Sequence, residues 1–234
     1  KSIAIVGASQ DPEKIASVIL RNLIQDGYNG KIYPINPKYE DIQGRKAYPN
    51  IISVPDNIEM VCIAIPHQFV EDVVDQCINK KVKSVVIISA GFKEVGSQGK
   101  ELELRISQKL KDNGIRLIGP NCLGFINNKA KINLTFAREN PGDGNIAFIS
   151  QSGAFCTAIL DMACEKHLGF SQVLSIGNKA DINENELISL FSNDSNISAI
   201  ALYLEEFTDG KEFVTLAQKS KKPIILIAPG SSEK

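Results

Sequence analysis

Apolar residues along the chain follow two alternating periods. Short runs rich in β-branched residues predict strands, and the stretches between them carry apolar residues at helical spacing, as at Ile15, Ile19 and Leu23. The predicted strands are 2–6, 31–35, 60–65, 84–89, 116–118, 145–150, 171–176, 199–204 and 223–228. The predicted helices are 15–26, 68–79, 99–112, 153–167, 184–193 and 210–219. Strands that alternate with helices in this way predict an α/β fold with mainly parallel sheets.

One stretch in the middle of the chain interrupts the alternation. Residues 127–144 lack either period and end in Pro141, Gly142, Asp143 and Gly144, a combination typical of turns and linkers. The pattern therefore predicts a first domain over 1–126, a linker over 127–144 and a second domain over 145–234. A single large sheet is the alternative.

Composition narrows the class of protein. Hydrophobic residues make up 43% and charged residues 23% of the 234 residues, which is ordinary globular usage. Because 26 basic residues nearly balance 27 acidic ones, no basic field predicts binding to nucleic acid or to an anionic membrane. No apolar run reaches the roughly 18–20 residues that span a bilayer, and the chain does not open like a secretory signal.

Cysteine and histidine usage points to the cytoplasm and away from metal chemistry. The five cysteines are odd in number, lie far apart and include no C-x-x-C pair, which argues against a disulfide scaffold and a zinc site. The two histidines, His67 and His167, leave little material for a metal centre. We therefore expect a soluble cytoplasmic protein without a bound metal.

The turn after the first predicted strand is a candidate anion site. Ligands of parallel sheets lie at the carboxyl ends of strands, beside the N-termini of helices. Gly7, Ala8 and Ser9 would let a phosphate approach the backbone, and Ser9 offers a hydroxyl. The dinucleotide fingerprint G-x-G-x-x-G is absent, because its second and third glycines are missing. A tight turn without a ligand is the alternative.

Three further strand ends carry candidate contacts. Asn36, Pro37 and Lys38 follow the second strand, where an NAD site usually places an acidic residue. Lys38 instead suits a phosphorylated ribose, as in NADP or coenzyme A, although a solvated surface lysine is the simpler reading. Pro66 and His67 follow the third strand, where His67 fits either a ligand contact or a helix entry. The next strand ends before Ala90, Gly91 and Phe92, where a glycine lets backbone approach a ligand.

The second half carries its own candidates. Ser150, Ser152 and Gly153 precede a helix and can hold phosphate, or Ser152 can simply cap that helix. The elbow G-x-S-x-G of serine hydrolases is not present there. Glu205 ends an apolar strand, where a carboxylate is either catalytic or a charge that reaches solvent; Glu206 suits the second role.

Seven segments in order resemble one family, the nucleoside-diphosphate-forming acyl-CoA synthetases, and most of all the α part of its ADP-forming acetate–CoA ligases. The segments are IVGAS at 5–9, INPK at 35–38, SAGF at 89–92 followed by Glu94, IGPNCLG at 118–124, SQSG at 150–153, SIGN at 175–178 followed by Ala180 and Asp181, and YLE at 203–205. The resemblance covers essentially the whole chain. It implies a Rossmann-like CoA-binding domain followed by a flavodoxin-like domain of the succinyl-CoA-synthetase type.

The resemblance also implies a reaction and roles for these residues. Acyl-CoA, phosphate and ADP interconvert with acid, CoA and ATP through a phosphohistidine. The residues implied for CoA are Gly7, Ala8, Ser9, Asn36, Pro37 and Lys38 at the phosphate and adenosine end, Pro66, Ala90, Gly91 and Phe92 along the pantetheine, and Asn121 and Cys122 at the thiol end. Glu205 would orient the histidine. Cys122 is expected to be a small buried side chain and not a nucleophile.

One departure from the family limits what this chain is expected to do alone. Neither His67 nor His167 stands in the family's phosphohistidine motif, so we expect that histidine outside this chain. ADP or ATP with Mg would bind to an ATP-grasp domain or β subunit, also outside it. The substrates implied are CoA and a small carboxylic acid, with acetate the expected one. A regulatory CoA-sensing module of a protein acyltransferase and an NADP-binding module are the alternatives.

Overall fold

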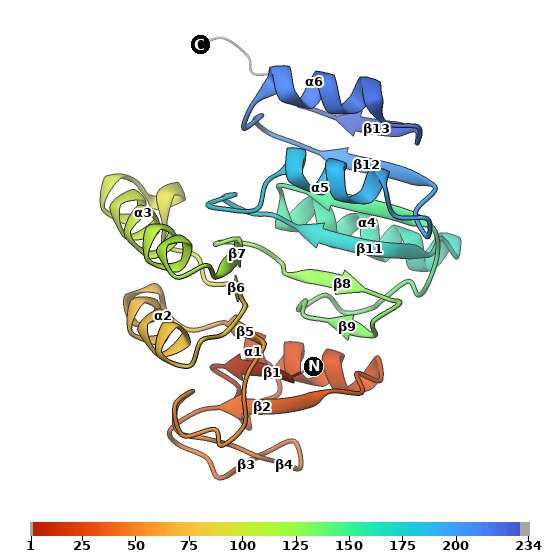
Figure 1. Cartoon of the computed structure of the whole chain (residues 1–234). Coiled ribbons are helices and arrows are strands. Elements are labelled where there is room, and N and C mark those ends of the chain that lie inside the picture. The colour runs from red at the N-terminus through yellow and green to blue at the C-terminus, as the bar shows by residue number, and fades with distance from the viewer. Residues whose placement is uncertain (1, 230–234) are drawn as a thin grey trace.

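A computed structural model describes residues 2–229 and divides them between two open sheets (Figure 1). The first sheet has the order β2-β1-β5-β6-β7, and all its neighbouring strands are parallel. Its strands are β1 (Ser2–Val6), β2 (Lys31–Ile35), β5 (Met60–Ile63), β6 (Ser84–Ile87) and β7 (Arg116–Ile118). Strands β2 and β5 come after β1 in the chain and pair with its two opposite edges. The sheet therefore has a topological switch point between β1 and β5.

The side chains of β1 point alternately to the two faces of the first sheet, and helices cover both faces. Ile3 and Ile5 pack in the core beneath α1 (Ile15–Gln25), whereas Ala4 and Val6 face α2 (Val70–Asn79) and α3 (Ser97–Asp112). Short 3-10 turns precede both of these helices, η1 (His67–Phe69) and η2 (Lys93–Val95). A small antiparallel hairpin of β3 (Asp41–Ile42) and β4 (Arg45–Lys46) follows β2 and has no counterpart in the sequence prediction.

The second sheet has the order β13-β12-β10-β11-β8-β9. Its parallel part consists of β10 (Ile146–Ser150), β11 (Phe170–Ser175), β12 (Ala199–Tyr203) and β13 (Ile224–Ile227). Helix α4 (Gly153–Lys166) covers one face, and α5 (Glu184–Ser192) and α6 (Gly210–Lys219) cover the other. Strands β11 and β12, which follow β10 in the chain, pair with its two opposite edges. A second switch point therefore lies between β10 and β12.

Part of the segment expected to be a linker is built into the second sheet. Strand β8 (Phe125–Asn127) pairs antiparallel with β11, and β9 (Ile132–Asn133) pairs antiparallel with β8. These strands are too short to show a period in the sequence. The expected boundary at residue 126 therefore falls inside a strand, and the division into domains stays a prediction.

The two sheets share one apolar core. A single cluster of buried side chains runs from Ile5 and Leu20 in the first half, through Phe125 and Leu134, to Ile149 and Leu202 in the second. The predicted element types hold throughout, and no end differs by more than two residues; β5, for example, ends at Ile63 instead of residue 65. The α/β fold with mainly parallel sheets is confirmed.

Candidate functional site

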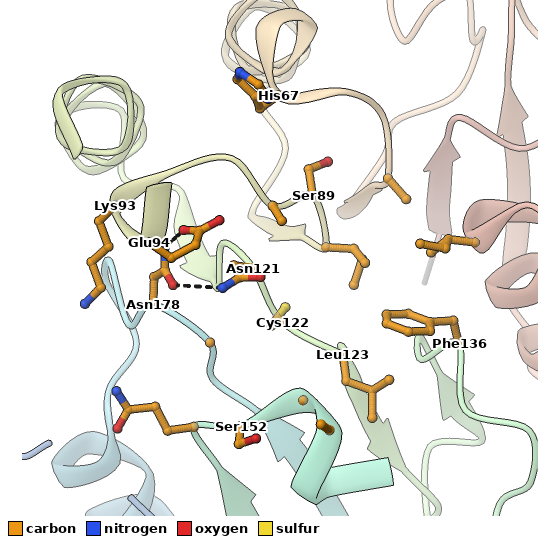
Figure 2. A pocket seen from close by; sticks show the side chains of 18 of the residues that line it. His67, Ser89, Lys93, Glu94, Asn121, Cys122, Leu123, Phe136, Ser152 and Asn178 are labelled. Carbon is orange, nitrogen blue, oxygen red and sulfur yellow. Dashed lines mark hydrogen bonds between the residues drawn. The ribbon is translucent and has the colours of Figure 1, made fainter. Parts of the chain in front are cut away.

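A cleft of about 1410 Å³ lies at the junction of the two halves. Figure 2 shows Glu94, Asn121 and Asn178 on one side of it and Leu123 and Phe136 on the other. The lining residues come from the loops that follow β1, β5, β6 and β7 in the first sheet and β10, β11 and β12 in the second. Both switch points therefore open into the same cleft, which is where ligands of open parallel sheets bind.

Gly7 is required by the backbone of the first loop. Its φ is +98°, and a Cβ there would lie 2.4 Å from the carbonyl oxygen of Ala64 on the neighbouring strand end. Gly7 and Pro66 line the cleft. Ala8 is completely buried behind the loop, and Asn36 Nδ2 donates to its carbonyl oxygen at 2.7 Å. Ala8 and Asn36 thus support the loop without reaching the cleft.

The loop after β6 is held by a carboxylate. Ala90 lines the cleft, while Gly91 has a φ of +106° and packs so closely on His67 that a Cβ would lie 2.4 Å from Nδ1. Glu94 Oε1 accepts from the N–H groups of Gly91 at 2.6 Å and of Phe92 at 3.1 Å. Burial alone would raise the pKa of Glu94, but these bonds and one from Asn178 outweigh it, so the pKa lies below its usual value.

Asn178 joins this loop to the second half of the chain. Its Nδ2 donates to Glu94 Oε2 and to Glu103 Oε2, both at 2.7 Å, and Glu103 is a buried residue of α3. Asn121 Nδ2 donates to Asn178 Oδ1 at 3.3 Å (Figure 2). The main chain adds bonds from Asn178 N–H to the carbonyl oxygen of Pro120 and from Ala180 N–H to that of Gly119. The loop after β11 is thereby fixed against the turn after β7.

Cys122 lies in the floor of the cleft but is not activated. It is 4% exposed, and its Sγ contacts the carbonyl oxygen of Ile87 at 3.3 Å. Burial raises the pKa of the Cys122 thiol to about 12. A thiol in this state is protonated at neutral pH, as expected of a structural cysteine.

The start of α4 forms the floor on the second side. Ser152 caps the helix, because its Oγ accepts from the N–H of Phe155 at 3.2 Å. The N–H groups of Gly153 and Ala154 have no acceptor within residues 2–229. Ser150 is fully buried, and its hydroxyl donates to the carbonyl oxygen of Ser152 at 2.7 Å. Ser150 therefore holds the cap in place, and the free N–H groups are what an anion would meet.

Glu205 lines the cleft from the turn after β12. Gln151 Oε1 accepts from the N–H groups of Glu205 at 3.0 Å and of Glu206 at 3.2 Å. The Glu205 carboxylate itself has no hydrogen bond or ion pair with any residue of the described range 2–229. Glu206 instead pairs with Lys93 at 3.2 Å, and that lysine is the first cause of the lowered pKa of Glu206.

The structure brings together half of the residues predicted from sequence. Those that line the cleft are Gly7, Pro66, Ala90, Asn121, Cys122, Ser152, Gly153 and Glu205. The other eight do not line it: Ala8, Ser9, Asn36, Pro37, Lys38, Gly91, Phe92 and Ser150. Phe92 is completely buried in the core on the α2–α3 face, so its side chain supports the loop instead of lining a ligand path. The Ser9 hydroxyl accepts from Asp11 N–H at 3.1 Å, and Ser150 is buried as described.

Pro37 and Lys38 line a separate hollow of about 660 Å³, together with Tyr39, Lys46 and Pro49. Sequence reasoning missed Lys14, Lys100 and Phe136, which line the main cleft, and buried Glu103 behind it. Lys14 directly precedes α1 and had a usable signal, because it stands at the entry of the helix that follows Gly7. Nothing in the sequence around Phe136 or Glu103 indicated a position at the cleft.

No three His, Cys, Asp or Glu residues among 2–229 lie together as a metal site would require. None of the described helices combines the length and apolar character needed to cross a bilayer.

Comparison with known families matches both halves. Residues 1–128 match the CoA binding domain, and residues 143–234 match the succinyl-CoA ligase like flavodoxin domain. The chain belongs to the family of CoA-binding domains, here followed by a succinyl-CoA-ligase-like domain in the order predicted from sequence.

Individual relatives narrow the resemblance. The ADP-forming acetate–CoA ligase of Methanocaldococcus jannaschii is 46% identical over 100% of this chain and 33% of its own length. The α subunit of ADP-forming acetate–CoA ligase I of Pyrococcus furiosus is 42% identical over 100% of this chain and 52% of its own length. A solved structure, acetyl-coenzyme A synthetase 1 of Ca. Korarchaeum cryptofilum in complex with phosphate and ADP, has a TM-score of 0.94 at 41% identity and covers 99% of this chain and 50% of that one.

These matches confirm the predicted resemblance to the nucleoside-diphosphate-forming acyl-CoA synthetases. The chain spans about a third to a half of the length of the relatives it matches.

Proposed function

We propose that the chain is the CoA-binding and phosphate-site part of an ADP-forming acetate–CoA ligase. The complete enzyme would convert acetyl-CoA, ADP and phosphate into acetate, CoA and ATP, in either direction. The single observation that supports this most is that both switch points open into one cleft, lined by the Gly7 loop from the first sheet and by Ser152 and Glu205 from the second. A thioester and a phosphate bound at these two places would meet.

CoA is proposed to lie along the first half of the cleft. Its diphosphate would lie by Gly7, with Lys14 and Lys100 as nearby cations, and its pantetheine would pass Pro66 and Ala90 toward Asn121. Lys38 and Lys46, which line the separate hollow, are suited to the ribose phosphate. The family match of residues 1–128 supports CoA over NADP, as does the missing dinucleotide fingerprint.

Phosphate is proposed to bind at the start of α4. The free N–H groups of Gly153 and Ala154 and the positive end of a helix of 14 residues favour an anion there. A phosphate oxygen can then attack the thioester carbonyl beside Asn121 and Leu123. The new C–O bond forms as the C–S bond breaks, the CoA thiolate takes up a proton, and an acyl phosphate remains.

The phosphoryl group is proposed to pass next to a histidine and then to ADP. His67 lies on η1 above the Gly91 loop, and His167 follows the last residue of α4, at the opposite end from Ser152. His67 lines the cleft from the first half, but neither histidine is hydrogen-bonded or ion-paired to Glu205 within residues 2–229, and neither stands in the family's phosphohistidine motif. We therefore place the phosphorylated histidine outside this chain, with Glu205 as the catalytic residue that hydrogen-bonds its imidazole.

The nucleotide is proposed to bind outside this chain as well. An ATP-grasp domain or β subunit would hold ADP or ATP with Mg, in keeping with the greater length of the relatives. These substrates are metabolites of the cytoplasm, where we expect the enzyme to act.

The test combines binding and turnover. Titration calorimetry should detect binding of CoA and not of NADP; tighter binding of NADP would overturn the proposal. The complete enzyme should form ATP from acetyl-CoA, ADP and phosphate, and Glu205→Gln should slow this about 100-fold, since one charged hydrogen bond is lost. Glu165→Gln, on the exposed surface of α4, is the matched control and should keep the wild-type rate.

Two outcomes would redirect the proposal. CoA binding without ATP formation would favour the regulatory CoA-sensing module. Acid-labile phosphate mapped by mass spectrometry to His67 or His167 would show that the phosphorylated histidine lies within this chain.

A further inference from the structure

The turn that carries Glu205 rests on a buried ion pair that the proposed reaction does not use. Lys179 Nζ lies 3.2 Å from Glu184 Oε2, and the two side chains are only 3% and 0% exposed. A buried ion pair is a poor source of stability, because the desolvation of both charges can exceed their attraction. Its occurrence directly beside the cleft therefore calls for another explanation.

The hydrogen bonds of this pair all end on one short segment. Lys179 Nζ donates to the main-chain carbonyl oxygen of Glu206 at 2.8 Å. Glu184 Oε1 accepts from the N–H of Thr208 at 2.5 Å, and Oε2 accepts from the Thr208 hydroxyl at 3.1 Å. The ion pair thus holds the main chain immediately after Glu205 at two residues.

The opposite side of the same turn is also held. Gln151 Oε1 accepts from the N–H groups of Glu205 and Glu206, as described above. The backbone at Glu205 is therefore fixed on both sides, while its carboxylate stays free. A side chain held only through its backbone keeps its direction toward the cleft only as long as these bonds persist.

Helix stability alone does not account for the arrangement. Glu184 is the first residue of α5, where a carboxylate favours the helix dipole, and Asn183 caps that helix by accepting from the N–H groups of Asn185 and Glu186. An exposed glutamate at this position would interact equally favourably with the helix dipole. Glu184 is instead buried together with Lys179, and both side chains bond to residues 206 and 208. This arrangement indicates that the pair holds the turn after Glu205.

We propose that Lys179 and Glu184 are positioning residues that set the direction of the Glu205 carboxylate. This rests on the proposed function, since it acts through Glu205. Displacing a catalytic group by about 1 Å can cost roughly 100-fold in rate, so the loss of either bond to the turn should slow phosphoryl transfer without altering CoA affinity.

The test is a double-mutant cycle in the complete enzyme. Lys179→Met removes the ammonium group and keeps the length of the side chain, and it should lower kcat for ATP formation roughly 10- to 100-fold with the Kd for CoA unchanged. Combined with Glu205→Gln, it should cause little further loss, because the group that it positions is already absent. Lys211→Met, an exposed lysine of α6, is the matched control and should have no effect in either background.

Thr208→Val keeps the test decisive if Lys179→Met does not fold. It removes one hydrogen bond to Glu184 and should give a smaller loss of kcat that also disappears in the Glu205→Gln background. Equal fold-losses with and without the Glu205 carboxylate would overturn the inference and leave the proposed function standing, as would a wild-type rate in Lys179→Met. Absence of ATP formation by the wild-type enzyme would overturn the proposed function and the inference with it.

Discussion

Replacing Asn178 by alanine should destabilise the junction of the two halves. The change removes one amide that donates to two carboxylates at 2.7 Å each. Glu103 is 7% exposed and loses a charged hydrogen bond worth about 1.5–3 kcal/mol. Glu94 is exposed, so its bond is screened and worth about 0.5–1 kcal/mol. The free energy of unfolding at pH 7 should therefore fall by roughly 2–4 kcal/mol.

Urea denaturation provides the measurement, with Asn113→Ala as the matched control. Asn113 Nδ2 donates to a neutral carbonyl oxygen, that of Lys109, at 2.8 Å on the surface, so its loss should cost less than about 1 kcal/mol. If Asn178→Ala cost no more than Asn113→Ala, the bonds of Asn178 to Glu103 and Glu94 would contribute nothing beyond a surface contact, and the reasoning would be refuted.

The difference between wild type and Asn178→Ala should also depend on pH. The pKa of Glu94 is lower in the folded protein than the ordinary value, so its bonds contribute stability above the unfolded pKa of about 4.3 and lose it as pH falls through the folded pKa. Because the variant lacks one of these bonds, the gap between the two stability curves should narrow by the share of the Glu94 bond, about 0.5–1 kcal/mol, as pH falls through the folded pKa of Glu94. A constant gap from pH 7 to pH 3 would show that the bond to Glu94 contributes nothing to the loss.

Three further predictions concern Gly7, Cys122 and Lys38. Gly96→Ala, in open space at a φ of +117°, should cost about 1–3 kcal/mol of stability in urea denaturation. Gly7→Ala should cost more, because its Cβ also meets the Ala64 carbonyl oxygen at 2.4 Å; equal losses would contradict the close approach. In the native protein iodoacetamide should modify Cys164 before Cys122, as followed by mass spectrometry, because Cys122 is buried at 4% exposure whereas Cys164 is partly exposed. Lys38→Glu should weaken CoA binding in calorimetry more than dephospho-CoA binding, and equal losses would show that Lys38 does not contact the 3′-phosphate.

The fold was predictable because its signals are local. Each parallel strand is a short apolar run between turn residues, and each helix shows apolar spacing over at least two turns. Strands β8 and β9 were not predictable, since two or three residues cannot show a period and their partners lie elsewhere in the chain. The order of strands within each sheet has no local signal either.

The candidate site was predictable only where a residue follows a strand. Gly7, Ser152 and Glu205 stand at strand ends, and the parallel topology then brings those ends to one edge. Phe92 follows the same rule but turns into the core, because side-chain direction after a strand depends on the loop conformation. The contacts of Asn178 with Glu94 and Glu103 join residues 84 and 75 positions apart, and no local pattern encodes such a pairing.

Directional bonds at the junction are needed because apolar packing alone cannot align two binding sites. The shared core supplies the free energy that holds the halves together, but burial of apolar surface is non-directional and tolerates sliding. Two reacting groups must instead be held to within about 0.5 Å. The residues that can impose this are adjacent: Asn178 bonds toward the carboxylates of the first half, and Lys179, with a φ of +55°, bonds back toward the Glu205 turn. The loop after β11 therefore ties the proposed CoA side of the cleft to the proposed phosphate side through two consecutive side chains.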